Sequence, residues 1–506
     1  MSYEIQYVRT VVHFISGKSF SAQAGIKLDV FDPNTGAVQA RVEMGNKTVL
    51  DKAVESAKTA QESWAAVNPQ RRARVMFEFK RLLEVHMDEL ARLLSSEHGK
   101  VITDSKGDIQ RGLEVVEFAC GIPHLLKGEY TLGAGPGIDV FSMRQALGVV
   151  AGITPFNFPA MIPMWMFAPA IACGNAFILK PSERDPSVPV RLAELMIEAG
   201  LPAGVLNVVQ GDKAVVDAIL DHPDIKAVSF VGSSDIAQYV YGRGAANGKR
   251  MQCMGGAKNH GIVMPDADLD QAVSDILGAA YGSAGERCMA LPVVVPVGAK
   301  TADALRQHLV EAIPNLKVGV SGDVDAHYGP VITSAHKARV QNYIQTGVDE
   351  GAELVIDGRN FALQGYENGY FLGPTLFDHV TAGMKSYQDE IFGPVLQIVR
   401  ADTLEAALKL ASSHPYGNGV AIFTRDGKAA RDFAARVEVG MVGVNVPIPV
   451  PVAYHSFGGW KRSGFGDLNQ YGVDGIRFYT RTKTVTQRWP SAGPVSDQSF
   501  VIPTMN

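Results

Sequence analysis

The segment from residue 148 to residue 231 alternates short apolar stretches with amphipathic ones, and this alternation restricts the fold more than any other feature of the chain. The apolar stretches predict strands at 148–154, 176–180, 205–210 and 226–231. The stretches between them predict helices at 159–173, 188–199 and 214–220. Such alternation gives right-handed crossovers and a mostly parallel sheet with helices on both faces. We therefore predict an α/β protein whose ligands bind beyond the carboxyl ends of its strands.

The sequence before this segment predicts strands and helices with a mainly structural role. The sequence after it predicts a second α/β block. A turn at residues 32–36 joins hairpin-like strands. Further helices are expected at 47–66, 71–94 and 104–119. The second block runs from about residue 259 to residue 445. A strand-like stretch at 478–489 ends the chain before a Pro/Ser tail, and an exposed strand of this kind needs a partner edge.

Composition favours a soluble protein that acts on small molecules over one that binds nucleic acids or membranes. The 506 residues carry a net charge of −5 and no block of like charge, which argues against nucleic acid and anionic membrane. Residues 145–179 hold no charged side chain, but prolines and glycines break this stretch into pieces too short to span a bilayer. The first ten residues are polar, so we expect no secretory signal.

The four cysteines are Cys120, Cys173, Cys253 and Cys288, and they lie far apart. Their spacing indicates neither a metal site nor a disulfide framework. This usage fits a reducing compartment, and we expect a cytoplasmic protein without a metal.

Cys288 is the predicted centre of the chemistry. It lies in a small, glycine-containing loop, residues 281–291, between a predicted helix that ends near Ala280 and a predicted strand at 292–297. The neighbouring Arg287 would favour the thiolate, which is the form that attacks carbonyls. The alternative is that Cys288 is a small buried hydrophobe of the core.

Two predicted strand ends carry candidate cofactor ligands. Lys180–Glu183 offers a cation and a carboxylate, and Gly232–Ser234 opens a helix whose free amides suit an anion. Glu183 can accept hydrogen bonds from both hydroxyls of a ribose and would repel a 2′-phosphate, which favours NAD over NADP. Taken singly, each motif is also an ordinary charged turn. The glycine-rich residues 133–137 are no dinucleotide fingerprint, because a strand at 138–143 follows where a helix is needed.

Two other candidates also have simpler interpretations. Arg111 lies three residues from both Asp108 and Glu114 on a predicted helix, so a surface ion pair is the default interpretation. On the simpler interpretation of the turn at 389–394, Phe392 belongs to the core and Glu390 to the surface.

Four motifs occur in the order found in aldehyde dehydrogenases: residues 154–159 (TPFNFP), 180–183 (KPSE), Cys288 in its loop and 390–394 (EIFGP). Nearly the whole chain resembles that superfamily. Within it, the chain is most similar to CoA-acylating methylmalonate-semialdehyde (malonate-semialdehyde) dehydrogenases. This similarity rests on DIQRGLE at 108–114, GAKNH at 256–260, RCMA at 287–290 and NVPIPVP at 445–451.

The resemblance implies a fold with a Rossmann-like NAD-binding domain, a catalytic domain and a small sheet that assembles homodimers or homotetramers. It assigns residues 1–132 and 152–258 to the NAD-binding domain and residues 259–460 to the catalytic domain. Residues 133–151 and 475–506 would form the oligomerisation segments.

The resemblance also implies roles for single residues. Cys288 would be the nucleophile, and Asn157 would hold the oxyanion together with the Cys288 amide. Arg111 and Arg287 would bind the substrate carboxylate, for which a guanidinium is well suited. The cofactor-binding residues would be Phe156, Lys180, Glu183, Arg184, Ser233, Glu390 and Phe392.

The absence of a general base near Met254 predicts which molecule, water or CoA, takes the acyl group from Cys288. Hydrolytic members of the superfamily have a glutamate where Met254 aligns here, and a shift of one residue brings in Cys253 or Gly255, which are no better bases. Water, with a pKa near 15.7, needs a general base, whereas a thiol near 8.5 needs far less help. We therefore expect CoA as a co-substrate. One departure concerns the cofactor: Asp235 lies near the expected pyrophosphate, and Ala237 follows without the second glycine usual in the superfamily.

The resemblance, together with the missing base, implies NAD-dependent oxidative decarboxylation of methylmalonate semialdehyde or malonate semialdehyde, as in valine degradation. The products with CoA would be propionyl-CoA or acetyl-CoA, CO2 and NADH, formed through a cysteine thioester. Two alternatives remain open: a hydrolytic dehydrogenase of the succinate-semialdehyde type, and a binding protein that keeps the fold without turnover. One methyl group contributes only about 1 to 3 kcal/mol in a pocket, so the sequence does not choose between the two semialdehydes.

Overall fold

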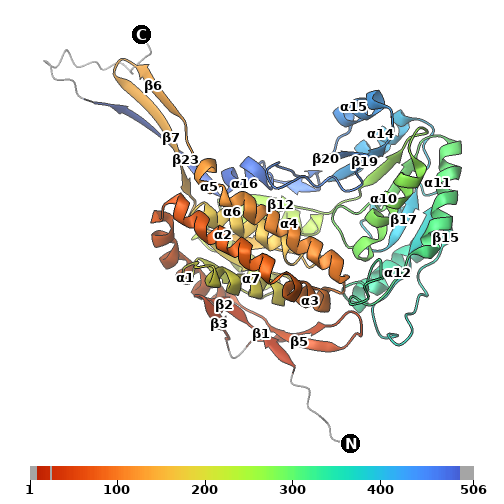
Figure 1. The fold of residues 1–506 in the computed structure, drawn as a ribbon, viewed down its shortest axis with the longest axis horizontal. Coiled ribbons are helices and arrows are strands. Elements are labelled where there is room, and N and C mark those ends of the chain that lie inside the picture. Colours follow the sequence, from red (N-terminus) through yellow and green to blue (C-terminus); the bar gives the residue numbers. More distant parts are fainter. Residues whose placement is uncertain (1–7, 23–24, 490–506) are drawn as a thin grey trace, which may run out of the picture.

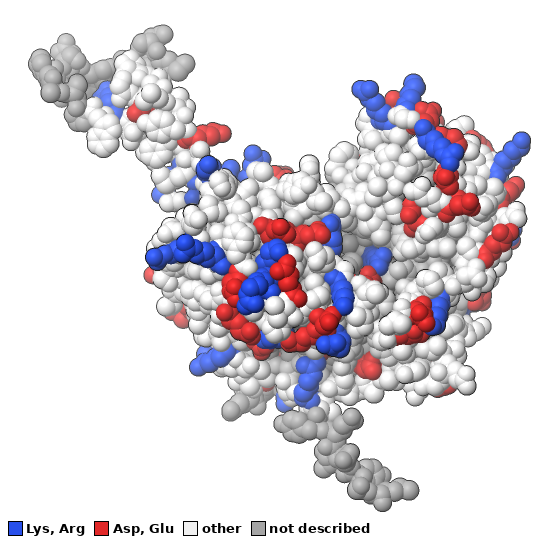
Figure 2. All heavy atoms as spheres, viewed as in Figure 1, with Lys and Arg blue, Asp and Glu red and all other residues white. Residues whose placement is uncertain are grey.

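The computed structural model describes residues 8–22 and 25–489. Two large sheets, each with its own helices and core, stand side by side, and a narrow three-stranded sheet projects from one of them (Figure 1). Lys and Arg side chains are interspersed with Asp and Glu on the face shown in Figure 2, and no broad patch of one sign is visible there. This pattern fits the small net charge of −5.

An eight-stranded sheet forms the first body, and its centre is parallel. Its strands lie in the order β22 (Gly464–Phe465), β12 (Arg250–Met254), β11 (Ile225–Val231), β8 (Val149–Ile153), β9 (Ala176–Lys180), β10 (Leu206–Val208), β2 (His13–Ile15) and β3 (Lys18–Phe20). The pairs from β12 to β10 are parallel, whereas β22, β2 and β3 are antiparallel additions at the edges. The predicted parallel sheet is confirmed.

Helices cover both faces of this sheet because the strands are apolar on both sides. One face packs against α1 (Lys47–Ala66), α8 (Lys213–Asp221) and α9 (Ser234–Ala246). The other packs against α2 (Pro69–Val85), α3 (Met87–His98), α4 (Ile102–Cys120), α6 (Met161–Ala172) and α7 (Ser187–Glu198), with the short α5 (Ile122–Leu125) and α16 (Gly472–Phe478) nearby. Neighbouring residues of β8 show the division: Val149 and Ala151 belong to the first core and Val150 to the second.

The charge-free segment 145–179 contains β8, α6 and all of β9 except its last residue, Lys180. Every residue of α6 is buried within the protein, and Pro169 interrupts its hydrogen bonding. Among the residues that the structure describes, no helix combines the length and the apolarity that a membrane span requires.

A seven-stranded sheet forms the second body. Its strands lie in the order β15 (Glu353–Ile356), β16 (Thr375–Asp378), β17 (Val395–Ile398), β14 (Val293–Pro296), β13 (His260–Val263), β19 (Gly419–Phe423) and β20 (Met441–Val444), and all pairs but β15–β16 are parallel. The surrounding helices are α10 (Leu269–Tyr281), α11 (Ala299–Ala312), η2 (Ile313–Asn315), α12 (Ser334–Asp349), α13 (Lys385–Gln388), α14 (Leu404–Ser413) and α15 (Gly427–Arg436).

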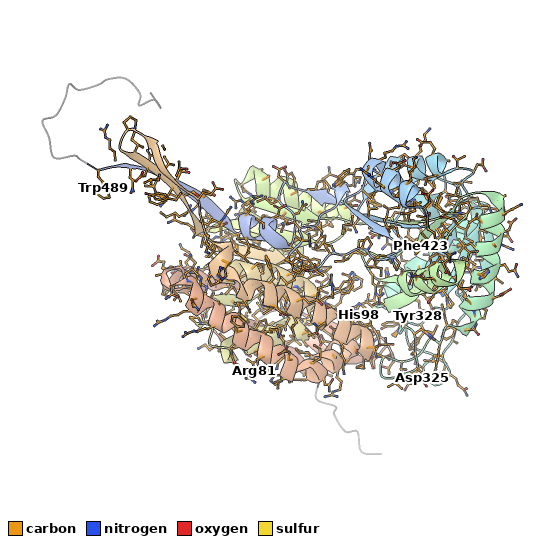
Figure 3. The ribbon with its side chains drawn as sticks, turned by 45° about the horizontal axis from the view of Figure 1, so that its top comes forward. Arg81, His98, Asp325, Tyr328, Phe423 and Trp489 are labelled. Carbon is orange, nitrogen blue, oxygen red and sulfur yellow. The ribbon has the colours of Figure 1, made fainter. Side chains whose placement is uncertain are left out.

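Smaller sheets complete the fold. The projecting sheet has the order β23 (Thr480–Arg488), β7 (Ile138–Ala146) and β6 (Tyr130–Gly135). The glycine-rich residues 133–137 comprise the end of β6 and the turn at Pro136 and Gly137 that leads into β7. The other small sheets are the pair of β18 (Tyr416–Gly417) and β21 (Trp460–Lys461) and the N-terminal sheet of β1 (Arg9–Val11), β5 (Val38–Glu43) and β4 (Lys27–Phe31). Trp489 lies on the projecting sheet, far from His98 at the junction of the two bodies (Figure 3).

The structure differs from the prediction in the helices at residues 69–98. The single helix predicted at 71–94 is wrong, because α2 and α3 meet at His86, which has non-helical angles of φ −96° and ψ 12°. Asp88 and Glu89 follow in the first turn of α3, where acidic side chains stabilise the positive end of a helix. The domain boundaries stay a prediction, although β8 begins at Val149, before the predicted boundary at 152.

Candidate active site

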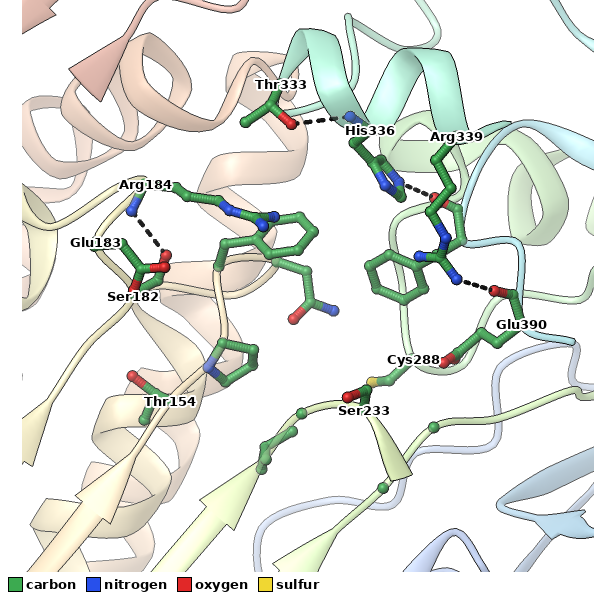
Figure 4. Close-up of a pocket in the computed structure, with 18 of the residues that line it drawn as sticks. Thr154, Ser182, Glu183, Arg184, Ser233, Cys288, Thr333, His336, Arg339 and Glu390 are labelled. Carbon is green, nitrogen blue, oxygen red and sulfur yellow. Dashed lines mark hydrogen bonds between the residues drawn. The ribbon is translucent and has the colours of Figure 1, made fainter. Parts of the chain in front are cut away.

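A cleft of about 500 Å³ lies at the carboxyl ends of the parallel strands of the eight-stranded sheet, where the seven-stranded sheet faces it. It is lined by all the predicted catalytic and cofactor-binding residues: Phe156, Asn157, Lys180, Glu183, Arg184, Ser233, Cys288, Glu390 and Phe392. In Figure 4, Cys288, Ser233 and Glu390 lie on one side of the cleft, opposite Glu183 and Arg184. The structure thus brings together residues that are far apart in the sequence, and their roles stay predictions.

Cys288 is held in a strained, clamped loop. Helix α10 passes into a single turn, η1 (Gly282–Gly285), in which Ser283 and Ala284 have φ values of 54° and 52°. The main-chain oxygen of Cys288 accepts hydrogen bonds from Asn259 Nδ2 at 3.0 Å and Asn418 Nδ2 at 3.1 Å. These two asparagines fix the position of a partly exposed thiol, and no local pattern in the sequence indicated them.

The expected activation of Cys288 by Arg287 is wrong for this structure. Arg287 Nη2 lies 2.6 Å from Asp104 Oδ1, so its charge is already paired. Burial, followed by the nearby Glu390 carboxylate, raises the pKa of Cys288 to about 11. The main-chain amides of Cys288 and Met289 and the Lys100 ammonium lower this pKa, and Arg287 is not among its main causes. At neutral pH the resting side chain is therefore a thiol.

Asn157 lies in the loop between β8 and α6 and is only 3% exposed. Its main-chain oxygen accepts a hydrogen bond from Lys100 Nζ at 2.6 Å. Because Asn157 comes from one sheet and Cys288 from the other, the cleft joins a predicted oxyanion donor and a predicted nucleophile across the junction of the two bodies.

The residues after β9 form a charged wall of the cleft. Lys180 Nζ lies 3.1 Å from Glu183 Oε2, and the Arg184 guanidinium lies 5.1 Å from the centre of the Phe156 ring. Burial alone would raise the pKa of Glu183, but the Lys180 ammonium holds it below the ordinary value. Glu183 therefore stays a carboxylate that can accept hydrogen bonds from a ribose.

Ser233 precedes α9 and forms no side-chain cap for it, so the first amides of this helix are free for an anion. Asp235, which the sequence placed near the expected pyrophosphate, is not among the residues that line the cleft. Its Oδ1 lies 2.5 Å from Arg462 Nη2, and its side chain is 89% exposed. Ala237, the other departure, is fully buried in the core beside the sheet.

The turn that carries Glu390 and Phe392 is fixed by α12, a contact that the sequence did not reveal. His336 Nε2 lies 2.7 Å from the Phe392 main-chain oxygen, and Arg339 Nη2 donates to the Glu390 main-chain oxygen at 2.9 Å. Phe392 has a φ of 62°, which explains why this turn needs such support. The Glu390 carboxylate accepts a hydrogen bond from Ala257 N at 2.9 Å, and burial raises its pKa to about 7.

Arg111 and Arg287 lie outside the main lining of the cleft. Arg287 borders a small cavity beside Cys288. Arg111 Nη1 lies 2.8 Å from Glu114 Oε2, as the default interpretation expected, and Nη2 donates to the Pro451 main-chain oxygen at 2.7 Å. Burial raises the pKa of the Tyr471 hydroxyl far above its ordinary value, and the Arg111 guanidinium opposes this rise.

The segment that would hold a hydrolytic base carries none. Met254 ends β12 and packs against the core, whereas Gly255 and Gly256 line the cleft. Cys253 is fully buried, and burial raises its pKa far above the ordinary value. The described residues contain one group that could bind a metal, Glu353 with Asp378 and His379. Arg400 is paired with Asp378 at 2.7 Å there, and none of the three lines the cleft.

The comparisons with known proteins agree in one family. The model of the aldehyde dehydrogenase family matches residues 20–485. The malonate-semialdehyde dehydrogenase of Pseudomonas aeruginosa is 55% identical over 98% of this chain and 100% of its own length.

Solved structures give the same result. A putative methylmalonate-semialdehyde dehydrogenase from Sinorhizobium meliloti, complexed with NAD, is 64% identical, with a TM-score of 0.95 over 96% of this chain and 99% of that one. Methylmalonate-semialdehyde dehydrogenase from Oceanimonas doudoroffii is 56% identical, with the same TM-score over 96% of this chain and 99% of that one.

Proposed function

Because the chain belongs to the aldehyde dehydrogenase family, we propose that it is an NAD-dependent oxidoreductase that converts a semialdehyde bearing a carboxylate into an acyl-CoA with loss of CO2. The substrates are malonate semialdehyde and methylmalonate semialdehyde, on which the relatives named above act by their names. The observation that carries the proposal is that Cys288, Asn157, Glu183 and Ser233 all line one cleft.

The cleft fits NAD. Glu183 can accept hydrogen bonds from the adenosine ribose beside Lys180 and Arg184, and the free amides after Ser233 suit the pyrophosphate. Phe156, Glu390 and Phe392 would border the nicotinamide half. When bound, NAD supplies the hydride acceptor.

The chain's own residues perform the acyl chemistry. Cys288 first gives its proton to water in the cleft, and the thiolate then attacks the aldehyde carbon. The oxygen that gains charge is stabilised by the Asn157 amide and the Cys288 main-chain N–H. Once the hydride has left, the acyl group remains on Cys288 as a thioester. Its free carboxylate is β to the thioester carbonyl, so loss of CO2 leaves an enolate whose charge lies on the same oxygen and which then takes up a proton. The donors that stabilised the first oxyanion can therefore act a second time.

Release requires a thiol. With Met254, Gly255 and Gly256 at the place of a hydrolytic base, water lacks activation, and the CoA thiol displaces Cys288 to give acetyl-CoA or propionyl-CoA. The hydrolytic alternative of the succinate-semialdehyde type has no observation in its favour. Arg111 and Arg287 would bind the substrate carboxylate after exchanging their present partners, Glu114 and Asp104.

Two further features support proposals for the assembly and the compartment. Strand β23 pairs with β7 on one side and has an open edge on the other among the described residues, and Tyr130 and Leu132 are exposed on the same sheet. We propose that this sheet assembles a homodimer or homotetramer, which sedimentation would detect. The four cysteines are free thiols, which suits a reducing, cytoplasmic environment.

The test is NADH formation from each semialdehyde with and without CoA, with the thioester product identified by mass. Strict CoA dependence and acetyl-CoA or propionyl-CoA as product would support the proposal, and Cys288→Ser should remove all turnover. Steady NADH formation to a free acid without CoA would establish the hydrolytic alternative. No NADH under any condition would indicate a binding protein.

A further inference from the structure

Lys100 is a buried charge behind the candidate active site. It lies between α3 and α4, and its side chain is completely shielded from solvent. An ammonium group loses several kcal/mol of hydration on burial, so it persists only where other groups compensate its charge. No local pattern in the sequence indicated this residue.

The contacts of Lys100 converge on the loop that carries Asn157. Its Nζ donates to the Asn157 main-chain oxygen at 2.6 Å, lies 3.6 Å from Asp108 Oδ2 and sits 4.3 Å from the centre of the Phe158 ring. Asp108 is buried as well, and its Oδ1 accepts a hydrogen bond from Met161 N at 2.6 Å. The ion pair therefore holds both ends of the loop 157–161: Lys100 holds the first residue and Asp108 the last.

We propose that Lys100 and Asp108 form a buried clamp that positions Asn157 for the oxyanion, and that the Lys100 ammonium adds positive charge to the site where the thiolate and the oxyanion develop. Both are positioning residues, since neither lines the cleft. The inference rests on the proposed roles of Asn157 and Cys288. It adds a source of positive charge that replaces Arg287, whose charge Asp104 already pairs.

The surroundings of Lys100 support an electrostatic role for its ammonium group. A hydrogen bond to one main-chain oxygen does not need an ammonium, and a buried ion pair by itself adds little stability. Fixed positive charge beside a developing anion stabilises a transition state without reorganisation. Lys100 also lowers the pKa of Cys288, behind the larger effects of burial, of Glu390 and of the main-chain amides of Cys288 and Met289. Other titratable groups that feel its charge are His98, Asp104, Asp108, Asp185 and Glu286.

Two variants separate position from charge. Lys100→Met combined with Asp108→Asn removes both charges together, so that no lone charge stays buried, and the new amide oxygen can still accept from Met161 N. Asp108→Asn alone keeps the ammonium. The matched control is Lys249→Met, which removes another buried lysine that donates to two main-chain oxygens, at 2.5 and 2.8 Å, and does not line the cleft.

The first readout is the pH dependence of Cys288 alkylation by iodoacetamide in the full-length protein, which needs neither NAD nor the semialdehyde. The double variant should shift the midpoint to higher pH, Asp108→Asn alone should shift it to lower pH, and Lys249→Met should leave it unchanged. Opposite shifts cannot come from general damage to the fold. A midpoint that stays at the wild-type value in both variants would overturn the electrostatic part of the proposal.

The second readout is turnover. The double variant should lose about 100-fold in kcat, the loss expected for a misplacement near 1 Å, with KM for NAD changed less than twofold. Wild-type kcat in this variant would overturn the positioning role. If the wild-type protein itself formed no NADH, the proposed function would fail, and the alkylation profiles would still decide whether Lys100 acts on Cys288.

Discussion

Glu286 provides a test of how the active-site loop responds to pH. Its side chain is fully buried two residues before Cys288. Glu286 Oε1 accepts a hydrogen bond from Ile332 N at 3.2 Å, whereas Oε2 has no hydrogen-bond partner among the described residues. Burial raises the pKa of Glu286 from 4.5 to about 8. At neutral pH the group is therefore an uncharged carboxylic acid, and Glu286→Gln should preserve its shape and its charge state.

The size of the effect follows from linkage. The folded protein keeps the Glu286 proton up to about pH 8, whereas the unfolded chain loses it above 4.5, so the fold loses stability as pH rises between these values and no further above them. The window runs from about pH 4.5 to about pH 8, so a measurement that starts at pH 6 covers its last two pH units. At 1.36 kcal/mol per unit, the stability gap between Glu286→Gln and wild type should grow by about 2.7 kcal/mol between pH 6 and pH 9.

Urea unfolding at pH 6 and pH 9 measures this gap, with kcat at pH 7 as a check that the loop is intact. The control is Glu43→Gln, which replaces another buried carboxylate that accepts hydrogen bonds from Ser21 Oγ and Ala22 N. A gap of equal size at both pH values would refute the reasoning, because it would mean that Glu286 is already ionised or hydrated in the fold.

Three further predictions concern the cleft. Asn157→Ala should lower kcat by about 100- to 1,000-fold at an unchanged KM for NAD, and stopped-flow absorbance that finds a rate within a few fold of wild type would remove its oxyanion role. The pKa of Glu390, raised to about 7 by burial, should make NAD bind roughly tenfold more weakly at pH 6 than at pH 8, because protonation removes the carboxylate proposed to border the nicotinamide half; fluorescence titration of Glu390→Gln should show no such slope. Arg287→Met should raise KM for malonate semialdehyde but not for propionaldehyde, and equal effects on both aldehydes would contradict a carboxylate contact.

The fold class could be predicted because its signals are local. Each predicted strand between 148 and 231 depends on a continuous apolar stretch, and each corresponds to a strand of the eight-stranded sheet. The break between α2 and α3 was missed because apolar periodicity continues across His86, and the acidic pair Asp88 and Glu89 was the only signal of a new helix start.

Residues of the candidate site could be predicted only where a reactive or charged side chain lies within a short sequence motif. Cys288, Glu183 and Glu390 were found in this way and lie in one cleft. Lys100 and Asn418 could not be found, since their partners are Asn157 and Cys288, which are remote in the sequence. The activation assigned to Arg287 failed for the same reason: adjacency to Cys288 is visible in the sequence, but its pairing with Asp104 across 183 positions is not.

The chain path through the sheets sets an order of folding. All strands of the seven-stranded sheet lie between residues 260 and 444, so this body can close while the ribosome still holds the rest of the chain. The eight-stranded sheet takes its edge strand β22 from residues 464–465, and the projecting sheet takes β23 from residues 480–488. Domains of nascent chains usually finish in order from the N-terminus. Here the eight-stranded sheet receives its edge strand β22 only after all strands of the seven-stranded sheet, so truncation near residue 460 should leave the seven-stranded body as the part that resists proteolysis.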